Sequence, residues 1–398
     1  MIYTKLRSLY PRGSTRRVML MFILMNIFGF FALSGVRGFI IAFLEYMGYS
    51  ASVIGAVISV MAAFGIAGSF IIGFLCDRLG RIKPFYFLLM TLVLAASFVI
   101  YFAQPPIVGM FAAFALLGAS LVTCVQLMDS WVLESGEACK QAYGHARGAG
   151  AFGWALGLLI LGVVIAEFGY WALPIVSLIF MAITFFIAYR QPDAKKVKRG
   201  KIITISTLKE LFTNYRYIHL LLTTFMMFGM VSAEWVLNGI KAAQLGTPVT
   251  FGLFSGTLAM VEVPFFAMFQ HIHRRFKLTH IFVFGASIYI VRITLMGLAP
   301  SIGVMTLIGL TNAIAYAPCY ICAKLLLDAE IPEHLKTTGQ LIAAAVFAGL
   351  AGIIFPLAIG LVVDAVGLDA SFFILAGFAV VPFTLALIFA NLKPRENF

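Results

Sequence analysis

The sequence predicts an all-α membrane protein, with twelve transmembrane helices in two pseudo-symmetric six-helix bundles and both termini in the cytoplasm. The chain of 398 residues is 62% hydrophobic and only 11% charged, and it contains twelve apolar stretches of spanning length. A hydrocarbon core of about 30 Å needs about 20 apolar residues of helix. The expected spans are 18–44, 52–75, 84–103, 107–132, 145–166, 170–189, 217–240, 250–272, 279–299, 302–327, 338–363 and 369–391.

The basic residues predict the orientation. Of the 28 Lys and Arg residues, all but five precede the first span, follow the last or lie in every second gap between spans. Those gaps are cytoplasmic, because basic residues are retained on that side. The five exceptions are Arg37, Arg147, Lys241, Arg292 and Lys324. The net charge of +12 is thus a topology signal that also attracts anionic lipid, and we expect no nucleic-acid partner.

The only long polar segment divides the chain in the middle. It covers residues 190–216, contains the basic cluster Lys195–Arg199 and has six expected spans on either side. We therefore expect an N-terminal six-helix bundle over 1–189, a cytoplasmic linker over 190–216 and a C-terminal bundle over 217–398. The expected location is the plasma (inner) membrane, with the chain crossing it many times.

Cysteines and histidines indicate neither a disulfide framework, nor a metal site, nor an enzyme. The five cysteines map to spans or to the cytoplasmic side. The pair Cys319 and Cys322 lies inside a span without the four ligands of a structural zinc site. The histidines map near the cytoplasmic face without spaced acid partners. We expect no cofactor, with the proton gradient as the source of coupling.

A glycine-rich basic segment follows the second span. It runs from Gly73 to Lys83 as GFLCDRLGRIK, in which glycines favour a tight turn. The segment resembles the signature of the major facilitator superfamily, in which two six-helix bundles bind substrate between them. The resemblance implies a loop that latches the cytoplasmic gate. Its expected gating residues are Gly73, Asp77, Arg78, Gly80 and Arg81. The alternative is an ordinary charged loop.

Charges inside the spans are the main functional signal, because each is costly unless it is paired or solvated. Asp129 and Arg147 each lie nine residues from the centre of the loop that joins their helices. They are therefore expected at the same depth, about 13 Å of helix from that centre. Trp154 lies two turns beyond Arg147 on the same face. An acid, an arginine and an indole can together hold a sugar.

The same region resembles the lactose permease and oligosaccharide–proton symporter family. The residues that carry the resemblance are YGHAR at 143–147 and GWAL at 153–156. The resemblance implies that Arg147 and Asp129 bind the sugar hydroxyls and that Trp154 stacks on the ring. Wider relatives that carry nucleosides or phenylpropionate share the first of these motifs. A structural ion pair between Asp129 and Arg147 is the competing interpretation.

The second half carries the expected proton-coupling residues. Arg292 resembles the ninth-helix arginine of the permease's proton relay, and Glu262 lies equally far from the loop between its helix and that of Arg292. The two are expected at similar depth, where they can pair. The tenth helix departs from the family, since TNAIAY at 311–316 stands where lysine, histidine and glutamate are usual. Lactose-type coupling therefore does not carry over.

Two further charges lie in corresponding spans of the two halves. Arg37 is in the first span and Glu234 in the seventh. Arg37 is expected either to contact an anionic solute or to pair with Glu45 or Asp129. Glu234 is expected to offer a sugar contact, to titrate with transport or to pair between helices. Snorkelling to the interface is a further account.

The function predicted from these features is proton-coupled symport of a small polar solute, most simply a sugar or oligosaccharide, by alternating access. The alternatives are a proton-coupled importer of a nucleoside or an aromatic or organic acid, and a proton-driven drug exporter. The glycine-rich run in the fifth span, residues 148–154, lacks the proline that is usual in exporters. The expected partners are the solute, protons and the lipid bilayer, and the expected state is a monomer.

Overall fold

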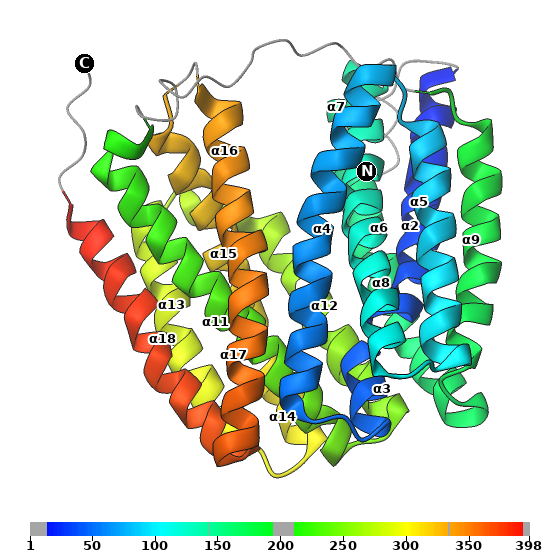
Figure 1. The fold of residues 1–398 in the computed structure, drawn as a ribbon. Coiled ribbons are helices and arrows are strands. Elements are labelled where there is room, and N and C mark those ends of the chain that lie inside the picture. Colours follow the sequence, from blue (N-terminus) through cyan, green and yellow to red (C-terminus); the bar gives the residue numbers. More distant parts are fainter. Residues whose placement is uncertain (1–13, 142, 194–210, 333–334, 393–398) are drawn as a thin grey trace. The chain divides into compact units, whose positions relative to one another are not determined.

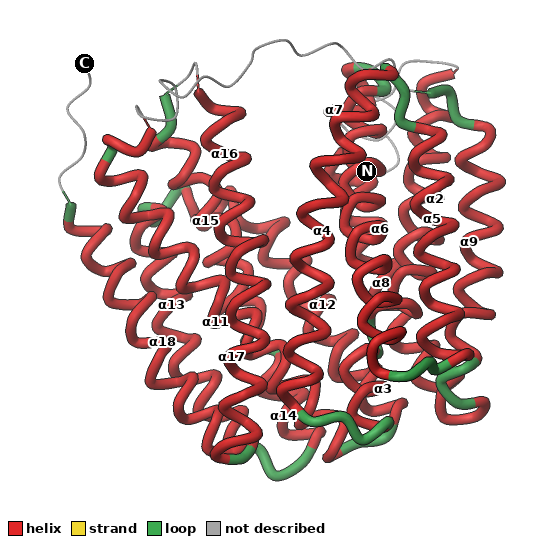
Figure 2. Tube along the Cα trace, viewed as in Figure 1, coloured by secondary structure: helices red, strands yellow, loops and turns green. Residues whose placement is uncertain are grey.

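The computed structural model describes residues 14–141, 143–193, 211–332 and 335–392. Most of the predicted linker, with the cluster Lys195–Arg199, lies outside the described residues. Every regular element of the described residues is a helix (Figures 1 and 2). Eleven of these helices are long and apolar enough to cross a membrane, and the count is twelve when the bent pair α14 and α15 is one span. The predicted all-α membrane fold is thus confirmed.

The first of two compact units comprises residues 1–40 and 64–200. Within it, α2 packs against α8 and α9, and α5 packs against α6. These helices run side by side in Figure 1. The unit contains α2 (Ser14–Arg37), the second part of α4 (Ala51–Leu79), α5 (Lys83–Phe98) with its π-helical end η1 (Val99–Ala103), α6 (Ile107–Glu134), α7 (Glu137–Gln141), α8 (Tyr143–Phe168) and α9 (Ala172–Arg190).

The second unit comprises residues 41–63 and 201–398, so α3 (Ile40–Tyr46) and the beginning of α4 group with it. Here α13 packs against α15 and α18, and α11 packs against α17 and α18. The remaining helices are α11 (Tyr215–Leu245), α12 (Pro248–His273), α13 (Leu278–Leu298), α14 (Ile302–Gly309), α15 (Asn312–Glu330), α16 (Lys336–Ala344), the π-helical η3 (Ala345–Leu350), α17 (Ala351–Val366) and α18 (Leu368–Asn391).

The apolar sequence explains both the helices and their surface. In lipid every backbone polar group needs a partner within the protein, and a helix supplies one from its own backbone. Large apolar side chains also remain exposed, as Val108 at 79% and Leu307 at 67% illustrate. A water-soluble protein rarely leaves many such side chains uncovered. The surface therefore fits a chain that is surrounded by lipid.

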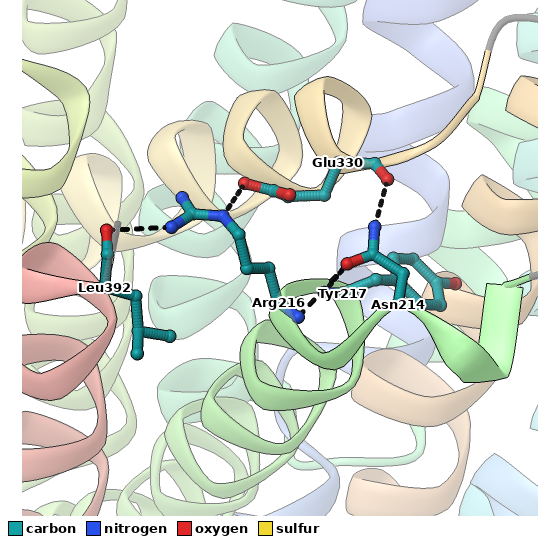
Figure 3. A network of polar contacts seen from close by, with 5 residues as sticks. All are labelled: Asn214, Arg216, Tyr217, Glu330 and Leu392. Carbon is teal, nitrogen blue, oxygen red and sulfur yellow. Dashed lines mark hydrogen bonds and ion pairs between the residues drawn. The ribbon is translucent and has the colours of Figure 1, made fainter. Parts of the chain in front are cut away.

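A polar network ties together three helix ends of the second unit (Figure 3). Arg216, near the start of α11, donates from Nε to Glu330 Oε1 at 2.8 Å and from Nη1 to the carbonyl of Leu392 at 2.9 Å. Asn214 caps α11 by accepting from the backbone N–H groups of Arg216 and Tyr217, and its amide donates to the carbonyl of Glu330 at 2.9 Å. The network joins the start of α11 to the ends of α15 and α18.

Candidate functional site

In the first unit, close packing of α8 on α2 positions the residues expected to bind solute. A Cβ at Gly153 would collide with the backbone of Ile27, and one at Gly150 would lie 2.7 Å from the ring of Phe30. Small residues at such positions let two membrane helices approach closely. Arg147 and Trp154 flank these glycines on α8, so this close packing helps to fix where both side chains lie.

The expected solute-binding residues of the first unit are all at least partly accessible. Arg147 is exposed, with its guanidinium carbon 4.7 Å from the centroid of the Phe30 ring. Trp154 on α8 and Asp129 on α6 are partly buried. An arginine that stacks on an aromatic ring keeps its planar donors available for hydroxyl or carboxylate groups. The unit thus leaves a cation, an acid and an indole at least partly exposed.

Arg37 is the last residue of α2, where it is partly buried. It takes part in an interaction with the rest of the protein, so it is not a free charge. Glu45, a partner considered for it from the sequence, accepts a hydrogen bond from Gln244 at 2.7 Å within the second unit. A direct contact between Arg37 and solute stays a prediction.

In the second unit, Glu234 and Arg292 form a buried ion pair between α11 and α13. The side chains are 4% and 2% exposed, and Arg292 Nη1 lies 2.8 Å from Glu234 Oε1 and 2.9 Å from Oε2. Asn238, one turn along α11, donates to Glu234 Oε1 at 3.2 Å. The sequence predicted both charges but paired Arg292 with Glu262. The depth of a side chain in the membrane does not specify the helix face on which it lies, and in the structure Arg292 pairs with Glu234 instead.

Glu262 lies on α12 and accepts a hydrogen bond from Asn312, for which the sequence predicts no role. Asn312 Nδ2 donates to Glu262 Oε1 at 2.7 Å and to the carbonyl of Leu258 at 3.3 Å. Glu262 also lies within electrostatic range of Arg292. The structure therefore brings Glu234, Glu262 and Arg292 into one cluster, which also contains Asn312.

The tenth span is broken just before Asn312, the residue that bonds to Glu262. Helices α14 and α15 are bent by 44° relative to each other, and Asn312 is the first residue of α15. Broken spans place polar groups at membrane depth in many transporters. The break could not be predicted from the composition of the span, which is apolar, although an asparagine inside an apolar span indicates a polar site. Asn238 was missed as well, although it lies one turn from the noted Glu234.

The predicted gating segment is mostly helical and not a loop. Helix α4 continues through Gly73, Asp77 and Arg78 to Leu79, so the tight turn of this segment comes only after these residues. The chain turns at Gly80, whose φ is +65°, a value that favours glycine. Arg78 and Arg81 are exposed, as expected for residues at a membrane surface.

The helix that follows this turn is capped from the far end of the first unit. Asp193 Oδ1 accepts from the backbone N–H groups of Ile82 at 3.2 Å and Lys83 at 3.0 Å. The Lys83 ammonium donates to the carbonyls of Tyr189 at 2.6 Å and Gln191 at 2.9 Å. The start of the predicted linker is thus part of the first unit, where it binds the beginning of α5.

Comparisons with known proteins agree with the fold. The model of a family described as "MFS_1 like family" matches residues 19–374. The sucrose permease of Escherichia coli is 22% identical over 376 residues, which are 88% of each chain. A crystal structure of a variant of the nucleoside transporter NupG has a TM-score of 0.81 at 14% identity and covers 94% of this chain and 99% of its own. A POT family transporter in complex with a thioalcohol-conjugated peptide has a TM-score of 0.74 at 11% identity, with 94% and 96% covered.

Proposed function

Since this chain belongs to the MFS_1-like family, we propose that it couples uptake of a small polar solute to proton entry by alternating access. The protein is a multi-pass membrane transporter with the major facilitator fold, and not an enzyme. A sugar or oligosaccharide is the solute that its residues fit best. The similarity to a sucrose permease makes sucrose the first sugar to test.

The observation that carries this proposal is the accessible set of polar and aromatic side chains in the first unit. Arg147 and Asp129 offer hydrogen bonds to hydroxyl groups, and Trp154 offers a flat apolar surface to a sugar ring. Bonds from charged groups are worth about 1.5–3 kcal/mol each, enough to orient a neutral polyol. Arg37 is a further contact with the solute in this proposal.

The second unit supplies the coupling in this proposal. Glu262 carries the proton, and Arg292 stabilises the ionised carboxylate when the proton leaves. No cofactor is required, because the proton gradient provides the energy. The segment that includes Gly73, Asp77, Arg78, Gly80 and Arg81 latches one side of the transporter.

The proposal also specifies the surroundings of the protein. Both termini lie in the cytoplasm, as the distribution of basic residues predicts, and the chain resides in the plasma (inner) membrane. Its partners are the solute, protons and lipid, with no nucleic acid, and it works as a monomer.

The second candidate solute is a nucleoside. The high structural similarity to a nucleoside transporter favours it, and a base can stack on Trp154 as a sugar can. An aromatic or organic acid would instead pair its carboxylate with the Arg147 guanidinium. A proton-driven drug exporter is the remaining alternative.

The test measures external pH in a lightly buffered suspension of energy-depleted cells that express the protein. Sucrose, a galactoside, a nucleoside and an aromatic acid are added in turn. Alkalinisation on sugar addition that disappears with Asp129→Asn supports the proposal. The control is Glu137→Gln, which removes an exposed acid of the same unit and should leave the response unchanged. If only the nucleoside or the acid gives a response, that solute replaces the sugar in the proposal. If no solute gives a response, export becomes the favoured function.

A further inference from the structure

The cluster in the second unit contains two acids and one arginine. Glu234 and Arg292 are paired and almost inaccessible, and Glu262 is within electrostatic range of the same arginine. Nearby titratable groups are Tyr289 on α13 and Tyr316 and Cys319 on α15, all of which are neutral in their ordinary forms. If both carboxylates were ionised, the cluster would carry a net charge of −1.

The closest other cations of these helices are already engaged. Lys241, two turns along α11, donates to Asp369 at 2.9 Å and to the carbonyl of Gly297 at 2.6 Å. Lys324 on α15 lies with its ammonium 4.3 Å from the centroid of the Tyr320 ring. A buried carboxylate without its own counter-charge takes up a proton more readily than it stays ionised. One proton in the cluster would bring its net charge from −1 to zero.

Three buried polar atoms around the pair have no hydrogen-bond partner among the described residues. They are the Nε of Arg292, the Oδ1 of Asn238 and the hydroxyl of Tyr289. Their side chains are 2%, 4% and 0% exposed. Such atoms are costly to leave unpaired, so each needs an explanation. They include an acceptor next to Glu234 and a donor on the shared arginine.

These atoms are the partners that a second arrangement of the same cluster would use. If Glu234 carried the proton, its O–H could donate to Asn238 Oδ1 or to the Tyr289 hydroxyl. The Arg292 guanidinium would then be released to pair with Glu262. In the arrangement seen here Arg292 pairs with Glu234, which leaves the proton on Glu262 beside Asn312.

We propose that Glu234 and Glu262 form one proton site in which a single proton is shared across Arg292. The proton leaves the carboxyl group of one glutamate and binds the carboxylate of the other, while the guanidinium stays charged and changes partner. Glu262, the less buried acid, exchanges the proton with the outside of the cluster. Glu234 thus belongs to the coupling machinery and does not touch the solute. The role in transport rests on the proposed function, whereas the shared proton does not.

Infrared spectroscopy of the purified protein, prepared with isotopically labelled glutamate, tests the shared proton directly. The expected result is the carbonyl stretch of a protonated glutamate at neutral pH, which disappears when the pH is raised. Glu234→Gln and Glu262→Gln should each abolish this band, because either change leaves one acid and one arginine. The control Glu137→Gln, in an exposed pair with Lys140, should keep it.

Three outcomes would overturn the inference. The band is absent from the wild-type protein, it survives both substitutions, or only one substitution removes it. If a glutamine variant does not fold, Asn312→Leu provides a second test, because loss of the hydrogen bond from Asn312 Nδ2 to Glu262 Oε1 should shift the frequency of the band. An unshifted band in that variant would also contradict the inference.

Transport in proteoliposomes with sucrose separates this inference from the proposed function. Both glutamine variants should exchange internal for external sucrose and should lose accumulation driven by a proton gradient. If the wild-type protein moves none of the candidate solutes, the proposed function fails, and the infrared band still decides whether the proton is shared. Retained accumulation in Glu234→Gln would remove Glu234 from the coupling machinery.

Discussion

The two units differ in how accessible their candidate charged residues are. In the first unit, Arg147 is exposed and Asp129 is partly accessible. In the second, Glu234 and Arg292 are almost fully buried and paired with each other. An accessible charge can exchange water for solute at little cost, whereas a buried pair can change only if a proton or a partner moves with it. This difference fits the proposed division, with solute binding in the first unit and proton coupling in the second.

The largest expected effect comes from removal of the buried arginine. Arg292→Met leaves Glu234 buried without its partner, so the unfolding free energy should fall by about 3–5 kcal/mol. Arg147→Met in the first unit should cost less than about 1 kcal/mol, because it removes only an exposed cation–aromatic contact. Thermal unfolding in detergent measures both. A similar loss for the two variants would refute the comparison, and Glu234→Gln combined with Arg292→Met should recover part of the stability.

Helix packing in the first unit provides the next effect. Gly153→Leu should destabilise the protein by roughly 1–3 kcal/mol or more, because its Cβ meets the backbone of Ile27. The matched control is Gly148→Leu on the same helix, where a Cβ would have no atom within 4 Å. The yield of folded protein after size-exclusion chromatography checks the pair. Equal yields would show that α8 does not depend on close contact with α2.

Each unit also has a helix cap that can be removed without touching the candidate sites. Asp193→Ala removes the acceptor for the first N–H groups of α5, and Asn214→Ala does the same for α11. Each should lower the unfolding free energy by about 1 kcal/mol. Asn214→Ala should cost more, because its amide also holds the end of α15. Chemical denaturation distinguishes the two, and a larger loss for Asp193→Ala would reverse the expected order.

The smallest effect is expected at the exposed pair in α7. Glu137 and Lys140 lie 3.9 Å apart with 71% and 62% of their side chains exposed. Pairs of this kind contribute about 0–1 kcal/mol, so Glu137→Gln should change neither stability nor transport measurably. A clear loss of transport in this variant would mean that charges outside the candidate residues of the two units also contribute to transport.

Much of this architecture was predictable from the sequence, because spans follow from hydropathy and charges inside spans are rare. That rule found Asp129, Arg147, Glu234, Glu262 and Arg292 without any structure. The pairing of Arg292 was not predictable, since counting residues from a loop gives depth but not the rotation of each helix. The bend before Asn312 was also hard to predict, because the span as a whole is apolar enough to read as one helix.

The gating segment shows a similar limit. A glycine permits a turn without requiring one, so Gly73 could lie within α4 while Gly80 forms the turn. The contact of Asp193 with the start of α5 joins residues far apart in the chain. No local pattern identifies such a long-range cap.

The most direct test of the division between the units is sucrose binding to two purified variants, measured by titration calorimetry. Asp129→Asn should weaken binding by roughly tenfold to a hundredfold, because it removes a charged acceptor for sugar hydroxyls. Glu262→Gln should bind sucrose as the wild-type protein does, since its expected task is to carry the proton. The opposite result, with normal binding by Asp129→Asn and lost binding by Glu262→Gln, would contradict this account.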